Sequence, residues 1–131
     1  MTIERINPDG LLASPAYTHV TVSHGTQIIH LAGQVAQDAT GAIIGSTHEE
    51  QAEQVWRNLL TALAAVDATI EDVAKRTIYI VDYTPDVLPG LGRATTKVLG
   101  PDAPTPASTL IGVASLYLPG LLIEIDAVVV R

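Results

Sequence analysis

Two carboxylates alternate along the last segment of the sequence, where Leu121 to Val130 is expected to form a β-strand. Every second side chain of a strand points to the same face, so Glu124 and Asp126 share a face about 7 Å apart. Two neighbouring carboxylates can serve as acid and base when burial separates their pKa values. The same spacing also fits a polar face of an edge strand, or acids hydrogen-bonded at a subunit seam. Taken alone, it favours this structural interpretation.

Two histidines form a second candidate pair. The segments Thr18–Ser23 and Thr26–Leu31 are rich in β-branched residues and are separated by a His-Gly dipeptide, which fits a two-residue hairpin. Such a hairpin would place His19 opposite His30. A catalytic zinc needs three protein ligands, and the sequence offers no obvious third, so we expect no metal site.

Other catalytic motifs are missing from the sequence. There is no cysteine to act as a nucleophile or a zinc ligand, and no Gly-x-Ser-x-Gly elbow is present. The glycine-containing stretch at residues 88–92 lacks the Lys-Ser/Thr ending of a phosphate-binding loop. We therefore expect no cofactor.

The composition limits the possible partners. The chain has 131 residues, of which 47% are hydrophobic and 16% charged, and this predicts one folded domain over residues 1–131. Seven basic against fourteen acidic side chains give a net charge of -7, the opposite of a nucleic-acid-binding surface. No apolar stretch reaches the roughly 18 residues of a membrane span, and no signal peptide is recognisable. We expect a soluble cytoplasmic protein with no nucleic-acid or membrane partner.

Hydrophobic periodicity predicts the elements that position these residues. After three short N-terminal strands, Ser46 or Thr47 begins a helix whose apolar stripe runs to Val66. A strand over 76–81, a second helix over 84–99 and strands over 108–114 and 121–130 follow. The order β-β-β-α-β-α-β-β predicts an α+β fold, a single mixed β-sheet covered on one face by two helices. The uncovered face and the apolar composition predict a homo-oligomer.

Five segments together resemble the RidA/YjgF superfamily. Ala16–Val20 and Ile29–Val35 are similar to its Y-S-H-A-V and V-S-G-Q-I segments. Gln51–Leu60 looks like its Q-x-x-Q-x-x-x-N-L helix, Ala68–Lys75 like its G-A-S-L-D-D-V-V-K turn, and Ile123–Ala127 like its V-E-I-E-A strand. The segments occur in the family's order and cover nearly the whole chain.

The resemblance implies a chorismate-mutase-like domain assembled as a homotrimer. In this family the sheets pack into a central barrel, and three clefts at the subunit interfaces take a small-molecule metabolite. The typical activity, which needs no cofactor, is the hydrolysis of reactive enamines and imines to 2-oxo acids and ammonia. The implied function is therefore that of an enamine or imine deaminase, a hydrolase acting on C=N bonds.

The site residues implied by the resemblance are Tyr17, Gly33 and Glu124, with Glu124 positioning the attacking water. The family also binds the substrate carboxylate through the Arg of P-A-R-S, but here Ser108 stands at that position. Ser108 is therefore a fourth expected site residue, which would shape the pocket with Tyr17 and the Gly33 backbone. A serine supplies no charge, so carboxylates should bind roughly tenfold to a hundredfold more weakly.

Three functions are compatible with this set of residues. The chain could represent a branch without the arginine that takes a less acidic metabolite. It could also be an ordinary 2-iminobutanoate/2-iminopropanoate deaminase whose anchor has moved elsewhere, with Arg93 or Arg5 as the arginines considered. The third is a non-catalytic binding or structural trimer. Nuclease activity, sometimes attached to this family's name, is not expected of so acidic a chain without a metal or His–His arrangement.

Overall fold

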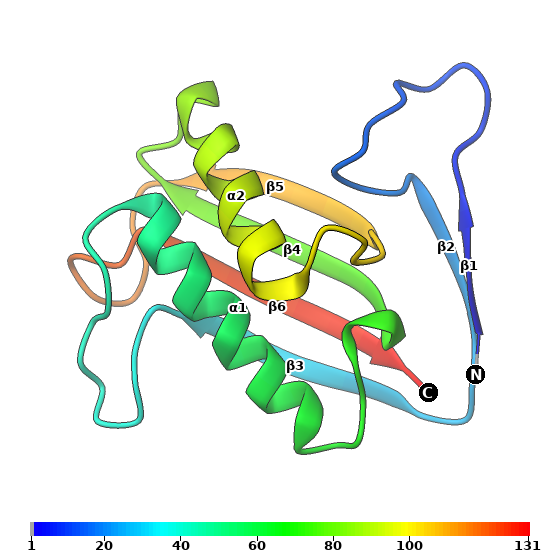
Figure 1. The fold of residues 1–131 in the computed structure, drawn as a ribbon, viewed down its shortest axis with the longest axis horizontal. Coiled ribbons are helices and arrows are strands. Elements are labelled where there is room, and N and C mark those ends of the chain that lie inside the picture. The colour runs from blue at the N-terminus through cyan, green and yellow to red at the C-terminus, as the bar shows by residue number, and fades with distance from the viewer. Residues whose placement is uncertain (1) are drawn as a thin grey trace.

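Four strands form the main sheet of the computed structural model, which describes residues 2–131. Their order across the sheet is β3 (Ile28–Val35), β6 (Ile123–Val130), β4 (Val73–Val81) and β5 (Ala107–Val113). β6 runs antiparallel to both of its neighbours, whereas β4 and β5 are parallel (Figure 1). The predicted α+β fold with a mixed sheet is confirmed.

Two helices, α1 (His48–Ala64) and α2 (Leu88–Leu99), lie side by side on one face of this sheet (Figure 1). The first begins where the sequence predicted, because the Thr47 side chain accepts a hydrogen bond from the Glu50 backbone N–H and so satisfies one of the free donors of the first turn. Its apolar stripe is buried against the sheet at helical spacing, with Ala52, Val55, Trp56, Leu59 and Leu63.

Short 3-10 turns lead into the later elements. η1 (Ile70–Asp72) carries a capping box in which the Thr69 and Asp72 side chains bond each other's backbone. η2 (Pro85–Val87) leads directly into α2, whose own proline lies in the first turn, where no backbone donor is needed. α2 ends at Gly100, which takes a φ of 93° that favours glycine.

Strand β6 divides its side chains cleanly between two environments. Ile123, Ile125 and Val129 are at most 1% exposed beneath the helices, and burying each such side chain contributes about 1.5–3 kcal/mol. The intervening Glu124 and Asp126 therefore project from the opposite face, which no helix covers. The predicted shared face of the two carboxylates is confirmed, and the burial of their neighbours fixes it.

The N-terminal strands depart from the single sheet that the sequence predicts. β1 (Thr2–Ile6) pairs with β2 (Val20–His24) in a separate two-stranded sheet, which stands beside the main one in Figure 1. The loop between these strands returns to the main sheet through a parallel bridge between Thr18 and Ala107.

The predicted hairpin of β2 and β3 is wrong, because β3 pairs with β6 instead. The backbone N–H groups of Thr26 and Gln27 both donate to the carbonyl of Arg131, which ties the start of β3 to the C-terminus. β6 offers a long partner that is distant in sequence and invisible to a local pattern. His19 consequently bonds the Leu12 carbonyl at 2.7 Å, and the expected pair with His30 does not form.

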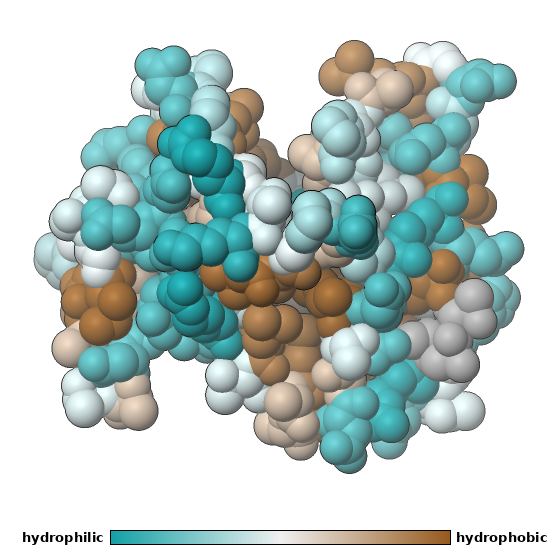
Figure 2. All heavy atoms as spheres, in the orientation of Figure 1, coloured by the Kyte–Doolittle hydropathy of each residue, from teal (hydrophilic) through white to brown (hydrophobic). Residues whose placement is uncertain are grey.

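The helix-bearing face of the molecule is uneven (Figure 2). Hydrophobic side chains come to the surface near its middle, hydrophilic ones surround them, and a notch separates α2 from the part that carries β1 and β2. Within residues 2–131, no helix combines the length and hydropathy needed to cross a membrane.

Candidate functional site

Glu124 lies in the middle of the open sheet face, fitted against a glycine. In the register of the sheet it is opposite Val35 of β3 and Tyr79 of β4. An added Cβ at Gly33 would lie 2.7 Å from Cδ of Glu124, which is too close for two carbon atoms that are not bonded. The register shift between Leu31 and Gln34 brings this glycine over the carboxylate. Two of the residues that the sequence singled out, Gly33 and Glu124, are therefore in direct contact.

The surroundings of Glu124 favour its protonated form. Burial raises the pKa of Glu124 above its usual range, and the nearby charge of Asp126 adds to this effect. Among residues 2–131, no Lys or Arg forms an ion pair with either acid. A carboxyl with a raised pKa accepts a proton more readily than an ordinary carboxylate, which suits it to exchanging a proton with water or with a reacting nitrogen.

Asp126 is held in one position by its neighbours on β4. One carboxylate oxygen accepts from the Thr77 backbone N–H at 3.1 Å, and the other accepts from the Tyr79 hydroxyl at 3.1 Å. This bond to Asp126 is also the main reason that the pKa of Tyr79 is raised. Asp126 thus supplies a fixed negative charge beside Glu124, while Tyr79 keeps its proton.

Ser108 faces the other side of the sheet, where it meets an arginine that the sequence analysis had not considered. It is directly opposite Arg76 in the parallel pairing of β4 and β5, and its Oγ accepts from Nε of Arg76 at 3.0 Å. Nη2 of the same guanidinium donates to the Ala16 carbonyl at 2.8 Å. Its Cζ lies 5.5 Å from the Trp56 ring centre, within cation–π range.

Arg76 is only 8% exposed. Burial lowers the pKa of Arg76 to about 10, so the guanidinium is still charged at neutral pH. The pattern of β4 held a signal for this residue, because Arg76 alternates with Ile78 and Ile80 and so lies on the strand's apolar face. A charged side chain at that position is buried, because the helices cover this face of the strand.

Tyr17 is held near the same arginine through its neighbour in the chain, because Arg76 bonds the Ala16 carbonyl. It follows Ala16 directly, and its ring meets His19 edge-on with ring centres 5.1 Å apart. The next residue, Thr18, fastens this segment to the start of β5 through bonds to the Thr105 and Pro106 carbonyls. Tyr17, Ser108 and Arg76 therefore gather at one end of β5.

The four predicted site residues thus form two groups that one subunit keeps apart. Glu124 is on the open face opposite Tyr79, whereas Arg76 lies three residues earlier on β4, on the covered face, with Ser108. Both groups could contact one small ligand only if a second copy of the chain supplied one of them.

The two arginines considered from the sequence are engaged elsewhere. Arg93 forms an ion pair with Glu49 at 2.7 Å on the helices, and Arg5 of β1 bonds the Glu71 carbonyl at 3.4 Å. Within residues 2–131, neither bonds to Ser108 or Glu124, so neither replaces the missing arginine of the P-A-R-S motif.

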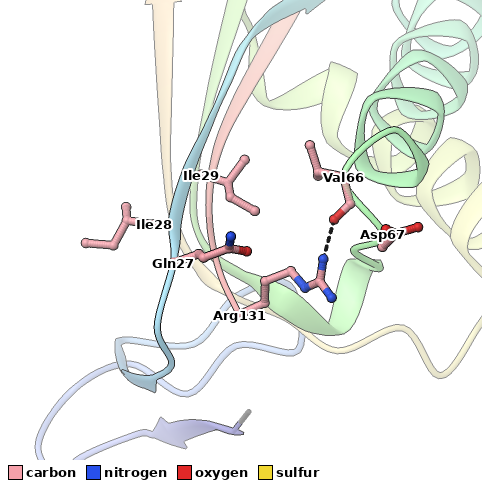
Figure 3. Close-up of a pocket in the computed structure, with 6 residues that line it drawn as sticks. All are labelled: Gln27, Ile28, Ile29, Val66, Asp67 and Arg131. Atoms are coloured by element: carbon pink, nitrogen blue, oxygen red, sulfur yellow. Dashed lines mark hydrogen bonds between the residues drawn. The ribbon is translucent and has the colours of Figure 1, made fainter.

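A surface pocket at the end of the sheet lies apart from both groups. It has a volume of about 440 Å³ and lies where β3 begins and β6 ends, with Arg131 donating to the Val66 carbonyl across it (Figure 3). It shares no lining residue with either group described above. Residues 2–131 gather no cluster of three or more His, Cys, Asp or Glu side chains that would suit a metal ion.

Comparison with known families identifies the family of the chain. The sequence profile of the family described as endoribonuclease L-PSP matches residues 9–131. The chain belongs to this family, also called RidA/YjgF. No curated protein matches the sequence.

Several solved structures share the fold over most or all of the chain. YyfB of Yersinia pestis, a member of the conserved Rid family, is 32% identical and covers 100% of both chains with a TM-score of 0.92. A putative endoribonuclease of Thermotoga maritima is 28% identical over 91% of this chain and 89% of its own, with a TM-score of 0.69. RidA of a Psychrobacter species is 25% identical over 98% and 99%, with a TM-score of 0.70.

Proposed function

We propose that the protein hydrolyses a small enamine or imine metabolite in clefts between the subunits of a homotrimer. The observation that carries this proposal is the Glu124 carboxyl, fitted against Gly33 and shifted toward its protonated form by burial and by Asp126. Membership of the Rid family, together with the likeness to a RidA structure, supports this class of reaction.

The proposed chemistry needs only water and one group that exchanges protons. The Glu124 carboxylate orients a water molecule and accepts its proton as the oxygen attacks the carbon of the C=N bond. The protonated carboxyl gives this proton to the imine nitrogen, which completes the carbinolamine. Glu124 then takes the proton of the carbinolamine hydroxyl and passes it to the amine nitrogen as the C–N bond breaks and the carbonyl forms. Imine and water become a 2-oxo compound and ammonia. A carboxyl with a raised pKa suits both steps, because its ionised form accepts a proton more readily than an ordinary carboxylate does.

The way one subunit divides the site supports an assembly of several copies, which we propose to be the trimer. Glu124 and Gly33 lie on the open face, and Tyr17, Arg76 and Ser108 lie near the β5 edge on the other face. Exposed aliphatic side chains, among them Ile28 at 70% and Ile111 at 42%, suit burial between copies. We propose that the β5 edge of one subunit meets the open face of the next. Light scattering should then report three times the monomer mass.

The experiment that tests the function is a coupled assay. An amino-acid oxidase generates 2-imino acids in place, semicarbazide traps what remains, and the protein competes with the trap by forming the 2-oxo acid. We expect hydrolysis by the natural chain and a loss of at least about 100-fold in Glu124→Gln. Glu71→Gln, an exposed acid on η1, is the matched control and should keep full activity.

A natural chain that leaves all of the imine to the trap would contradict the proposal. Binding of a metabolite without turnover would favour the non-catalytic trimer instead. Ribonuclease activity is not proposed, since a net charge of -7 opposes an RNA backbone.

A further inference from the structure

Arg76 is a buried cation with no acid to balance it. It bonds a hydroxyl and a carbonyl and stacks over an indole ring, and all three groups are uncharged. Within residues 2–131, no carboxylate lies within 4 Å of its nitrogens. A buried charge is costly unless it is paired, and replacing it by an apolar side chain of similar volume is often neutral or stabilising. Packing alone therefore gives no reason for a guanidinium at this position.

Part of the guanidinium is left free to bind a further group. Nε donates to Ser108 and Nη2 to Ala16, and these two bonds hold its plane in one orientation. The third nitrogen, Nη1, donates to no residue among 2–131. It is also partly accessible to solvent, because the one buried side-chain nitrogen without a partner among the described residues belongs to Arg5. A fixed donor with some access to solvent can receive an oxygen from outside the subunit. A small pocket of about 10 Å³, lined in part by Arg76, Trp56 and Pro106, can hold no more than one water.

We propose that Arg76 is the specificity-determining residue that binds the carboxylate of the metabolite, in the position next to Ser108. The inference rests on the proposed function, since it names the ligand class of the same interfacial cleft. Arg76 lies at the β5 edge beside Tyr17, where a second subunit would complete the site. A carboxylate is the group that a planar guanidinium recognises best, through two parallel bonds.

The pairing of β4 and β5 explains why Ser108 and Arg76 act together. The two residues are directly opposite, so a guanidinium that starts from either strand can reach the same region between them. A small residue at position 108 leaves room for the arginine side chain from β4 and also holds its Nε. The charge that the P-A-R-S motif would place on β5 is thus supplied from the neighbouring strand.

The test measures binding of pyruvate, a small 2-oxo acid, against its uncharged analogue pyruvamide by calorimetry. We expect the natural chain to bind pyruvate about 10- to 100-fold more tightly than pyruvamide, and Arg76→Gln to abolish this preference. Arg93→Gln removes an arginine that is exposed on the helices and should leave both affinities unchanged. Equal affinity of Arg76→Gln and the natural chain for pyruvate would overturn the proposal.

Two further measurements guard against a variant that fails to fold. In the natural chain, the Nε–H resonance of Arg76 should shift in a saturable way with pyruvate but not with pyruvamide. The double variant Arg76→Ser with Ser108→Arg returns the guanidinium to β5 and should recover the preference for pyruvate. Pyruvate that binds without moving the Arg76 resonance, or that does not bind at all, contradicts the proposal.

Failure of this inference is distinguishable from failure of the proposed function. Binding of pyruvate requires no turnover, so Arg76-dependent binding without imine hydrolysis would refute the function and support the carboxylate site. Hydrolysis that proceeds equally well in a folded Arg76→Gln would refute the carboxylate site and leave the function standing.

Discussion

The two faces of the four-stranded sheet hold opposite charges in opposite surroundings. Beneath the helices, one guanidinium, that of Arg76, is buried with uncharged partners only. On the open face, Glu124 and Asp126 stand side by side, and no Lys or Arg of residues 2–131 forms an ion pair with them. Each face carries a charge for which the described chain provides no counter-ion.

The difference between the faces separates the packed core, which gives stability, from the charged groups that we propose to bind and react. The covered face is a tightly packed apolar core apart from its one cation, whereas the open face is half-buried and polar at its centre. Local rules of stability are most often broken where a protein binds or reacts. On one face Arg76 is a buried cation without a counter-ion among residues 2–131, and on the other two acids lie side by side without one. Four predictions test this contrast.

The largest effect should come from the covered face. Ile125, which separates the two acids in the sequence, is fully buried on the covered face. Ile125→Ala leaves a cavity there that should lower the free energy of unfolding by about 2–5 kcal/mol. The adjacent Asp126→Asn keeps its shape and should cost much less. Urea unfolding of the two variants measures the contrast. Similar losses in both would mean that the open face contributes to stability as much as the core does.

On the open face, the largest effect should be on activity. In Gly33→Ala, the new methyl group would occupy the space of the Glu124 carboxyl. The carboxyl must then move, and it can do so because it is the free end of a flexible side chain. A displacement of about 1 Å at a reacting group can cost about 100-fold in rate. We expect an activity loss of that order with a smaller change in stability. Gly92→Ala is the control, since a Cβ there meets nothing within 4 Å.

The pH dependence of activity should report the interaction between the two acids. Burial and the charge of Asp126 raise the pKa of Glu124, and the attacking water requires the ionised form of Glu124. Activity should therefore rise with pH through that raised pKa. Asp126→Asn removes the negative charge, lowers the pKa of Glu124 and should move the rising limb to lower pH. A limb that stays in place would show that burial alone sets the pKa.

The smallest expected effect is a gain in stability. Because the folded state raises the pKa of Glu124, it holds the proton more tightly than the unfolded chain does. The resulting stabilisation of the folded state is complete below the pKa that Glu124 has in the unfolded chain. It is lost as the pH rises through the pKa that Glu124 has in the folded chain. Glu124→Gln has no proton to lose, so thermal unfolding should show it to be slightly more stable than the natural chain at neutral pH. The difference should shrink in acid, and a constant difference would contradict this origin.

The sequence by itself determined the elements and the alternation of the last strand. The Thr47 cap, the buried stripe of the first helix and the shared face of Glu124 and Asp126 depend on neighbours within a few residues, so their pattern is visible in the sequence. The family resemblance added Gly33 and Tyr17, whose placement no periodicity predicts.

Only the tertiary structure decided which strands pair and which side chains meet. β3 joined β6 rather than β2 because a partner almost a hundred residues away offered a longer ladder and a C-terminal carbonyl for its first N–H groups. The contact between Gly33 and Glu124 and the placement of Arg76 against Ser108 both arise across strands that are distant in the chain. Such contacts depend on sheet order and register, which a local pattern does not contain.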